Sequence, residues 1–273
     1  MSDESADILD LLDAAEEALY SNDDPAGAIE ACDQALEQVT EDGDFIELIL
    51  FKAEAEIAAE LDGFAVRTLS ELDSSVIDDA RVWCDVGQLW AAIGDEERTE
   101  DAYVRALELD DGLADAHYGA ALLYESKGDA KGMVHEFLRT LALDAQAPQP
   151  DVHVSEETLQ SIAESALTEL PPRALELLEN VPILIEDLPA RHMVEEGLDP
   201  RILGLFSGRP LTEVDSTGGQ SAGIDSIHLY QRNLERSVAD EEALADEIRI
   251  TVLHETAHFF GLEDDDLDDL GLG

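Results

Sequence analysis

The residues with the clearest chemistry lie near the end of the chain, where His254, Glu255 and His258 form the pattern H-E-x-x-H. On a helix, residues four positions apart share one face, so both imidazole rings can reach the same metal ion. Glu255 lies near that face and can take the proton of a metal-bound water. Two neutral imidazoles, one further carboxylate and an open position form the ligand set of a catalytic zinc site, so we expect Zn²⁺ as the cofactor.

The third ligand is expected from the acidic segment that follows. Gly261 can adopt the left-handed conformation that ends a helix and turns the chain back, and a residue three positions later can then reach the metal. That residue is Asp264, which we predict as the third metal ligand. Its neighbours Glu263, Asp265 and Asp266 offer the same carboxylate chemistry, so the choice among the four acids stays open.

A plain helix is the alternative, because H-E-x-x-H also arises by chance on a solvated polar face. The segment before the motif has helical spacing, with Leu244, Ile248 and Val252 on one apolar stripe. The glycine and the acid also fall at the extended positions H-E-x-x-H-x-x-G-x-x-D. These agreements favour the metal site.

Residues 6–146 contain a repeat of 34 residues. The copies that begin at Ala80 and Ala114 carry small, aromatic and turn residues in the same order: Gly87 with Ala121, Trp90 with Tyr124, Gly94 with Gly128, and Tyr103 with Phe137. Small residues let helices approach closely, aromatic rings fill the space between them, and glycines form the turns. The pattern resembles the tetratricopeptide family, with weaker copies before residue 80, and implies a solenoid of helical hairpins.

Such a solenoid offers a groove for a peptide or a partner protein, and the alternative is a rigid spacer that binds nothing. The carboxylate clamps of the resembled family use basic residues, of which the first 150 residues hold only eight. We favour a protein partner in the groove. We interpret His117 and His135 as packing or surface residues, because no further ligand is spaced with them.

A proline-containing segment at 147–152 interrupts the helical pattern and is the predicted linker between the repeats and a second domain at 153–273. There we expect a helix that begins after Ser155 and a helical piece at 174–179. Strands are expected at 181–187, 202–206 and 226–230, with a flexible loop at 216–223. The predicted fold class is mainly α, a helical-hairpin solenoid followed by a small α+β domain.

Residues 156–267 resemble a small bacterial family of zincin-like, or minimal, metallopeptidases. The resemblance rests on 181–187, 203–208 and 227–230, and most specifically on 253–262. It implies His254, His258 and Asp264 as zinc ligands, Glu255 as catalytic base, and a sheet edge that pairs with an extended substrate.

The sequence departs from the better-known metzincins at two points. Asp264 replaces their third histidine, and no methionine follows the motif, so no Met-turn is expected below the metal. His228 is interpreted as a surface or cleft-lining residue and is a minor candidate for a metal or oxyanion role. Tyr230 and Arg232 are minor candidates for an oxyanion role.

The net charge of −51 is spread along the chain, with 38 acids against 8 bases up to residue 150 and 28 against 7 after it. Such a surface repels nucleic acid and anionic membranes, which we exclude as partners. The acidic N-terminus has no signal-peptide pattern and no apolar run is long enough to span a bilayer, so we expect a cytoplasmic protein. Cys32 and Cys84 are expected as buried small side chains without a disulfide.

Two functions follow from these features. In the first, the protein is a zinc metallopeptidase: the metal polarises a peptide carbonyl, Glu255 removes the proton of the water, and the repeats recruit a protein substrate. In the alternative, the protein is an adaptor that binds partners through its repeats and keeps an inactive or structural zinc domain. All the hydrolytic residues are present, which favours the enzyme. The sequence specifies neither the substrate, the partner nor the oligomeric state.

Overall fold

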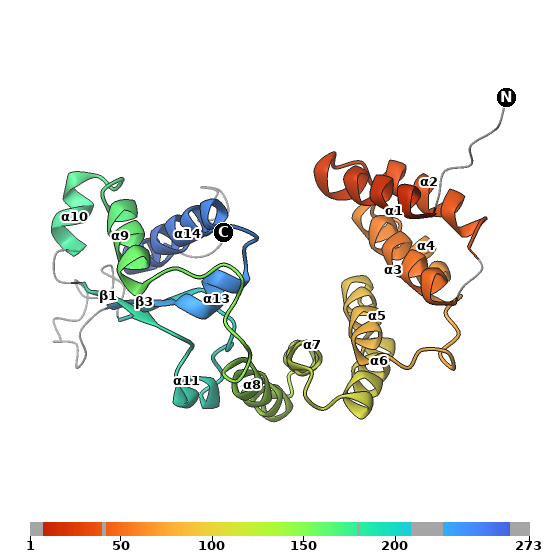
Figure 1. Cartoon of the computed structure of the whole chain (residues 1–273). Helices are drawn as coiled ribbons and strands as arrows, with labels where there is room; N and C mark the ends of the chain where they lie inside the picture. Colours follow the sequence, from red (N-terminus) through yellow and green to blue (C-terminus); the bar gives the residue numbers. More distant parts are fainter. Residues whose placement is uncertain (1–7, 40–41, 179–180, 209–225, 263–273) are drawn as a thin grey trace. The chain divides into compact units, whose positions relative to one another are not determined.

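The computed structural model describes residues 8–39, 42–178, 181–208 and 226–262. The chain divides into two compact units, residues 1–140 and 141–273. The described part is mainly helical with a small three-stranded sheet in the second unit, as predicted (Figure 1). Within it, no helix is both long enough and apolar enough to cross a membrane.

The first unit is built from helical hairpins. Its elements are α1 (Ile8–Glu16), the π-helix η1 (Glu17–Ser21), α2 (Pro25–Leu36), α3 (Asp42–Ala58), α4 (Asp62–Leu69), α5 (Ala80–Ile93), α6 (Glu96–Leu109), α7 (Ala114–Ser126) and α8 (Ala130–Asp144). The last turn of α8 belongs to the second unit. Helix α5 packs against α6, and α6 packs against α7. The 34-residue repeat therefore corresponds to one helical hairpin.

The features that identified the repeats shape the hairpins as expected. Gly94 and Gly128 have φ angles of 83° and 71° and form the turns that follow α5 and α7. Trp83, Trp90 and Tyr103 are buried in one apolar core. Cys32 and Cys84 are both buried free thiols. The first unit thus has the core and the turns that the sequence predicts.

The second unit combines helices with short strands. Its elements after α8 are α9 (Glu156–Leu167), α10 (Pro172–Leu178), β1 (Ile183–Glu186), α11 (Arg191–Glu195), β2 (Gly204–Ser207), β3 (Ser226–Tyr230), α13 (Gln231–Arg236) and α14 (Glu241–Phe259). Ser155 caps α9, as predicted, and accepts a hydrogen bond from the backbone of Thr158. Short helices α11 and α13 were not predicted. The loop expected at 216–223 lies outside the described residues.

Strand β3 lies in the middle of the sheet, parallel to β1 and antiparallel to β2. Ile227 and Leu229 point into the apolar core formed with α9 and α14, which lie side by side over that face (Figure 1). Because side chains alternate along a strand, His228 and Tyr230 point to the opposite face. Strand β2 forms an edge of the described sheet, and α14 packs directly against it.

The boundary between the units is close to the predicted linker. The compact units meet between Thr140 and Leu141, a few residues before the segment 147–152. Asp144 already has its side-chain contacts in the second unit, through Arg201 and Arg236. The domain bounds 6–146 and 153–273 stay a prediction.

Candidate active site

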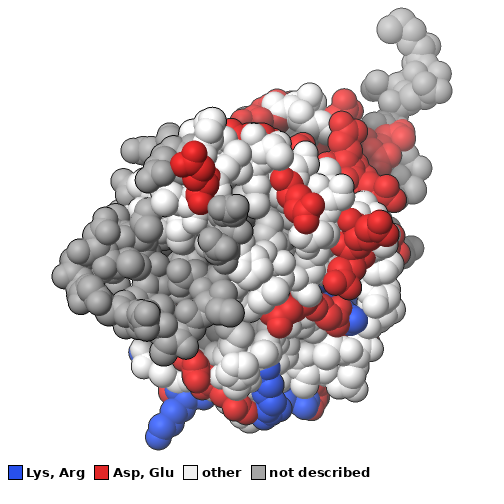
Figure 2. Space-filling model, turned by 90° about the vertical axis from the view of Figure 1, so that its left-hand side faces the viewer, with Lys and Arg blue, Asp and Glu red and all other residues white. Residues whose placement is uncertain are grey.

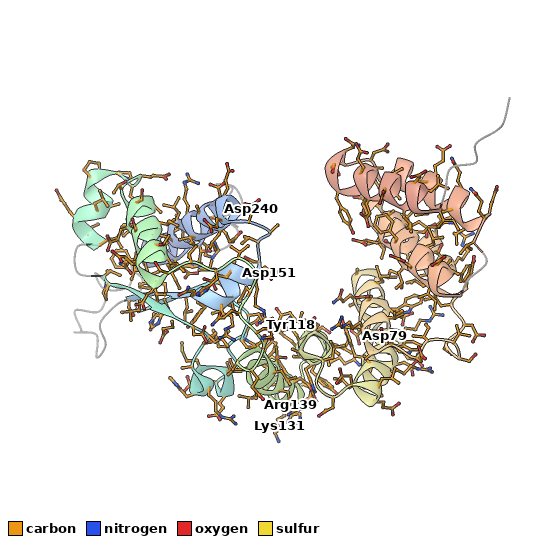
Figure 3. All side chains as sticks on the ribbon, in the orientation of Figure 1. Asp79, Tyr118, Lys131, Arg139, Asp151 and Asp240 are labelled. Carbon is orange, nitrogen blue, oxygen red and sulfur yellow. The ribbon has the colours of Figure 1, made fainter. Side chains whose placement is uncertain are left out.

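The motif residues lie on α14, and the local sequence explains where this helix begins and ends. The Asp240 carboxylate accepts hydrogen bonds from the backbone N–H groups of Glu242 (3.0 Å) and Ala243 (2.9 Å) and so caps the first turn (Figure 3). Leu244, Ile248 and Val252 are fully buried against the sheet. Gly261, with a φ of 80°, follows the end of the helix, as its predicted role requires.

The two histidines of the motif converge. His254 Nε2 and His258 Nε2 are 2.9 Å apart, and His258 Nδ1 lies 3.1 Å from the carbonyl oxygen of Leu262. A carbonyl partner keeps the proton on Nδ1 and leaves the Nε2 lone pair for a metal. Tetrahedral ligands at about 2.0–2.1 Å from Zn²⁺ are roughly 3.3 Å apart, so a small separation of the rings makes room for one ion.

The rest of the predicted ligand set lies beyond the described residues. Among the side chains that the structure describes, no group of three His, Cys, Asp or Glu residues could hold a metal ion. Asp264 and the neighbouring acids fall in the part that is not described. The two imidazoles fit Zn²⁺ by donor type and arrangement, and the third ligand stays a prediction.

Glu255 lies at the outer edge of β2, an arrangement that the motif alone did not reveal. Tyr230 N–H donates to the Leu203 carbonyl, and every second residue of β2 therefore turns its backbone groups away from β3. Phe206 is such a residue, and its N–H donates to Glu255 Oε2 at 2.5 Å. The side chain of Glu255 is buried, so the strand holds this carboxylate in place.

Gly204 allows the close approach of β2 to α14. A Cβ atom at this position would lie 2.6 Å from Thr251 Cγ2 and 3.1 Å from Glu255 Cγ. A side chain larger than that of glycine would therefore push the strand away from the helix. No sequence pattern marks this contact, because it depends on how two distant segments pack.

A cleft of about 370 Å³ runs between this strand and the helix. It is lined by Ile202, Leu203, Gly204, Glu247, Ile250, Thr251, His254 and Glu255. The cleft thus opens on the first predicted metal ligand and on the predicted base. A mainly apolar hollow with a few polar groups is the usual form of a substrate site.

The minor candidates on and after β3 have other partners. His228 Nδ1 lies 2.7 Å from Glu186 Oε2, and its Nε2 lies 3.0 Å from Ser226 Oγ. Arg232 donates to Asp187 and to the carbonyl oxygens of Asp144 and Ala147. These contacts explain both residues structurally, and a part in the chemistry stays a prediction.

Tyr230 is fully buried, and its hydroxyl lies 3.9 Å from Met193 Sδ of α11. Burial raises the pKa of Tyr230 to about 12, and the negative charges of Glu186 and Glu255 add to this effect. The phenol therefore keeps its proton at neutral pH. The oxyanion role suggested for Tyr230 stays a prediction as well.

Comparison with known proteins places the site in context. Residues 178–273 match the family model described as "Zincin-like metallopeptidase". No curated protein matches the chain. Two solved structures share 20% identity with it: "Crystal structure of MamA protein" covers 59% of this chain and 82% of that one with a TM-score of 0.42, and "Crystal structure of MamA" covers 57% and 84% with a TM-score of 0.40.

The family match contains the H-E-x-x-H motif, strands β1 to β3 and helix α14. The hairpins α5–α6 and α7–α8 carry the 34-residue repeat, with its turns and core in the expected places. The chain is a tetratricopeptide-like helical array fused to a zincin-like domain.

Proposed function

We propose that the protein is a zinc-dependent peptidase in which His254, His258 and Asp264 hold the metal and Glu255 is the general base. One observation carries this proposal: the Nε2 atoms of the histidine pair converge 2.9 Å apart on the helix face that also presents Glu255 to a cleft. The family match of residues 178–273 supports the same class of reaction.

Each residue has a defined part in such a reaction. Bound Zn²⁺ would polarise the peptide carbonyl and acidify a water molecule. The Leu262 carbonyl fixes the ring of His258, and the Phe206 N–H orients the carboxylate of Glu255. A carboxylate has two oxygens and several lone pairs, so Glu255 can take a proton while it is held at the strand.

The strand edge suits a peptide substrate. The backbone of Gly204 faces away from β3 and borders the cleft, whereas the outward N–H of Phe206 already donates to Glu255. An extended peptide can add to such an edge through main-chain hydrogen bonds. We propose that the helical repeats recruit the protein that carries this peptide, in the cytoplasm.

The metal site is tested by zinc content. Wild-type protein, dialysed after zinc loading, should hold about one zinc per chain, because the chain has one motif. His258→Ala should bind zinc at least about 10–100-fold more weakly, since even the loss of an outer partner of a ligand has this effect. Inductively coupled plasma mass spectrometry and a competition titration with a chelator provide the measurement.

The matched control for this experiment is His135→Ala, which removes an exposed histidine of the repeats. Full zinc binding by His258→Ala would refute the site. Normal zinc binding by the wild type without hydrolysis of any peptide would instead favour the adaptor.

Asp264 is tested against its neighbours. The helix ends at Phe259, and the positive φ of Gly261 turns the chain, which agrees with a return to the metal about three residues later. Asp264→Asn should therefore weaken zinc binding by at least about 10–100-fold. The same change at Asp265 or Asp266, and Glu263→Gln, should have little effect. A normal zinc affinity of Asp264→Asn, together with a loss in one neighbour, would assign the ligand to that neighbour.

A further inference from the structure

We propose that the cleft between β2 and α14 binds the side chain of a lysine or arginine of the substrate, with Glu247 as the specificity-determining residue. This inference rests on the proposed peptidase function and names its substrate class. It follows from the order of groups along the cleft and from the charges around it.

The α14 wall of the cleft is a single stripe. Glu247, Thr251 and His254 lie at positions i, i+4 and i+7, with Ile250 beside them. At 1.5 Å per residue, Glu247 lies about 10 Å along the helix from His254. A carboxylate therefore marks one end of the cleft and the predicted metal ligand marks the other.

The surface between these ends is mostly apolar. Ile250 comes from α14, and Ile202 and Leu203 come from the chain just before β2. Lysine and arginine carry a charged group on a stem of three or four methylenes, and the stem covers apolar surface while the head reaches a polar partner. An apolar stem with a cationic head therefore fits a cleft that has an apolar middle and a carboxylate at one end. An acidic side chain would be repelled, and an aliphatic one would leave the Glu247 carboxylate without a cation.

Among the described residues, no lysine or arginine forms an ion pair with Glu247. The second unit contains no lysine. Its described arginine side chains form ion pairs with other acids: Arg191 with Glu195, Arg201 and Arg236 with Asp144, Arg232 with Asp187, and Arg249 with Glu169. No described base therefore occupies the Glu247 carboxylate, which leaves this group available to a cation of a bound molecule.

The negative charge of the whole protein also favours a cationic substrate. Asp and Glu side chains spread over the face shown in Figure 2, where most of the visible Lys and Arg side chains gather near the lower edge. With a net charge of −51, the surface attracts cationic segments and speeds their encounter. Glu247 then selects one cationic side chain beside the reacting bond.

Cleavage profiling tests the proposal. Zinc-loaded full-length protein is incubated with a library of natural peptides, and the cleaved bonds are identified by mass spectrometry. Lysine and arginine should be enriched at one fixed position relative to the cleaved bond. Glu247→Gln should lower kcat/KM for a lysine peptide about tenfold, because a charge-assisted contact is lost. The peptide with norleucine in place of lysine should be nearly unaffected, and Glu242→Gln, an exposed acid on the same helix, is the matched control.

A binding measurement separates this proposal from the proposed function. Fluorescence anisotropy of labelled lysine and norleucine peptides is measured on zinc-loaded Glu255→Gln, which holds the peptide without turnover. The lysine peptide should bind about tenfold more tightly, and the added change Glu247→Gln should remove the difference. Equal binding of the two peptides, or cleavage without any preference for cations, overturns the role of Glu247 and leaves the peptidase intact. Selective binding without cleavage by the wild type refutes the peptidase and supports the cationic subsite.

Discussion

Glu255→Gln is expected to lower kcat/KM for peptide hydrolysis by about 10²–10⁴-fold, the usual contribution of a general base. An amide cannot take the proton of the attacking water at neutral pH. The amide oxygen can still accept the hydrogen bond from Phe206 N–H, and the size of the side chain hardly changes. Zinc content and thermal stability should therefore stay close to those of the wild type. Initial rates on the best peptide from the cleavage profile provide the measurement.

Glu255→Ala separates the chemical role from the structural one. This change removes both the base and the acceptor of the Phe206 N–H. It should therefore also loosen β2, which packs against α14 at Gly204. Hydrogen exchange at Phe206 should rise in the alanine variant and stay slow in the glutamine variant. If Glu255→Gln kept activity within severalfold of the wild type, another group would be the base.

The parts of the structure that the sequence predicts are those with local causes. The repeats are identified by small, aromatic and turn residues at a fixed period, and these residues act within one hairpin or between neighbours. The spacing of Leu244, Ile248 and Val252 predicts helix α14, and Gly261 predicts the turn that follows it, because both signals act within one or two helical turns. The pairing of His254 with His258 follows from helical spacing alone.

The parts that the sequence did not predict depend on contacts between distant segments. The bond from Phe206 to Glu255 joins residues 49 positions apart and requires the register of β2 against β3. The cleft needs Gly204 next to Thr251, and neither residue signals this on its own. Helices α11 and α13 are only five and six residues long, too short to show a helical period.

Asp144→Ala is expected to lower the free energy of unfolding of the second unit by about 3 kcal/mol, near the lower end of the range for breaking a buried ion pair. The Asp144 side chain is 1% exposed. It accepts hydrogen bonds from Arg201 Nε (3.0 Å) and Nη2 (3.2 Å) and from Arg236 Nη2 (2.7 Å). Removal of the carboxylate takes away the buried anion that the two guanidinium groups share. They remain 21% and 31% exposed, so water offsets part of the loss.

The lowered pKa of Asp144 makes the loss of stability caused by Asp144→Ala depend on pH. Burial acts to raise the pKa of this carboxyl, but the bonds from Arg236 and Arg201 outweigh burial and hold the pKa below its usual value. A pKa that is lower in the folded than in the unfolded protein stabilises the fold above the unfolded value of about 3.9, and this stabilisation is lost as the pH falls through the folded value. The difference between wild type and Asp144→Ala should therefore be full at pH 7 and should shrink below about pH 4.

The measurement must follow the second unit by itself. Both tryptophans, Trp83 and Trp90, lie in the first unit, so their fluorescence does not report on the site of Asp144. Hydrogen exchange of α13 and α14, followed by mass spectrometry at increasing urea concentration, resolves the second unit. Glu169→Ala is the matched control, because its pair with Arg249 is about half exposed on both sides and is weakened by solvent screening. If Asp144→Ala changed the unfolding free energy no more than Glu169→Ala does, water would solvate the freed arginines fully, and the buried pair would not hold the end of α8 to this unit.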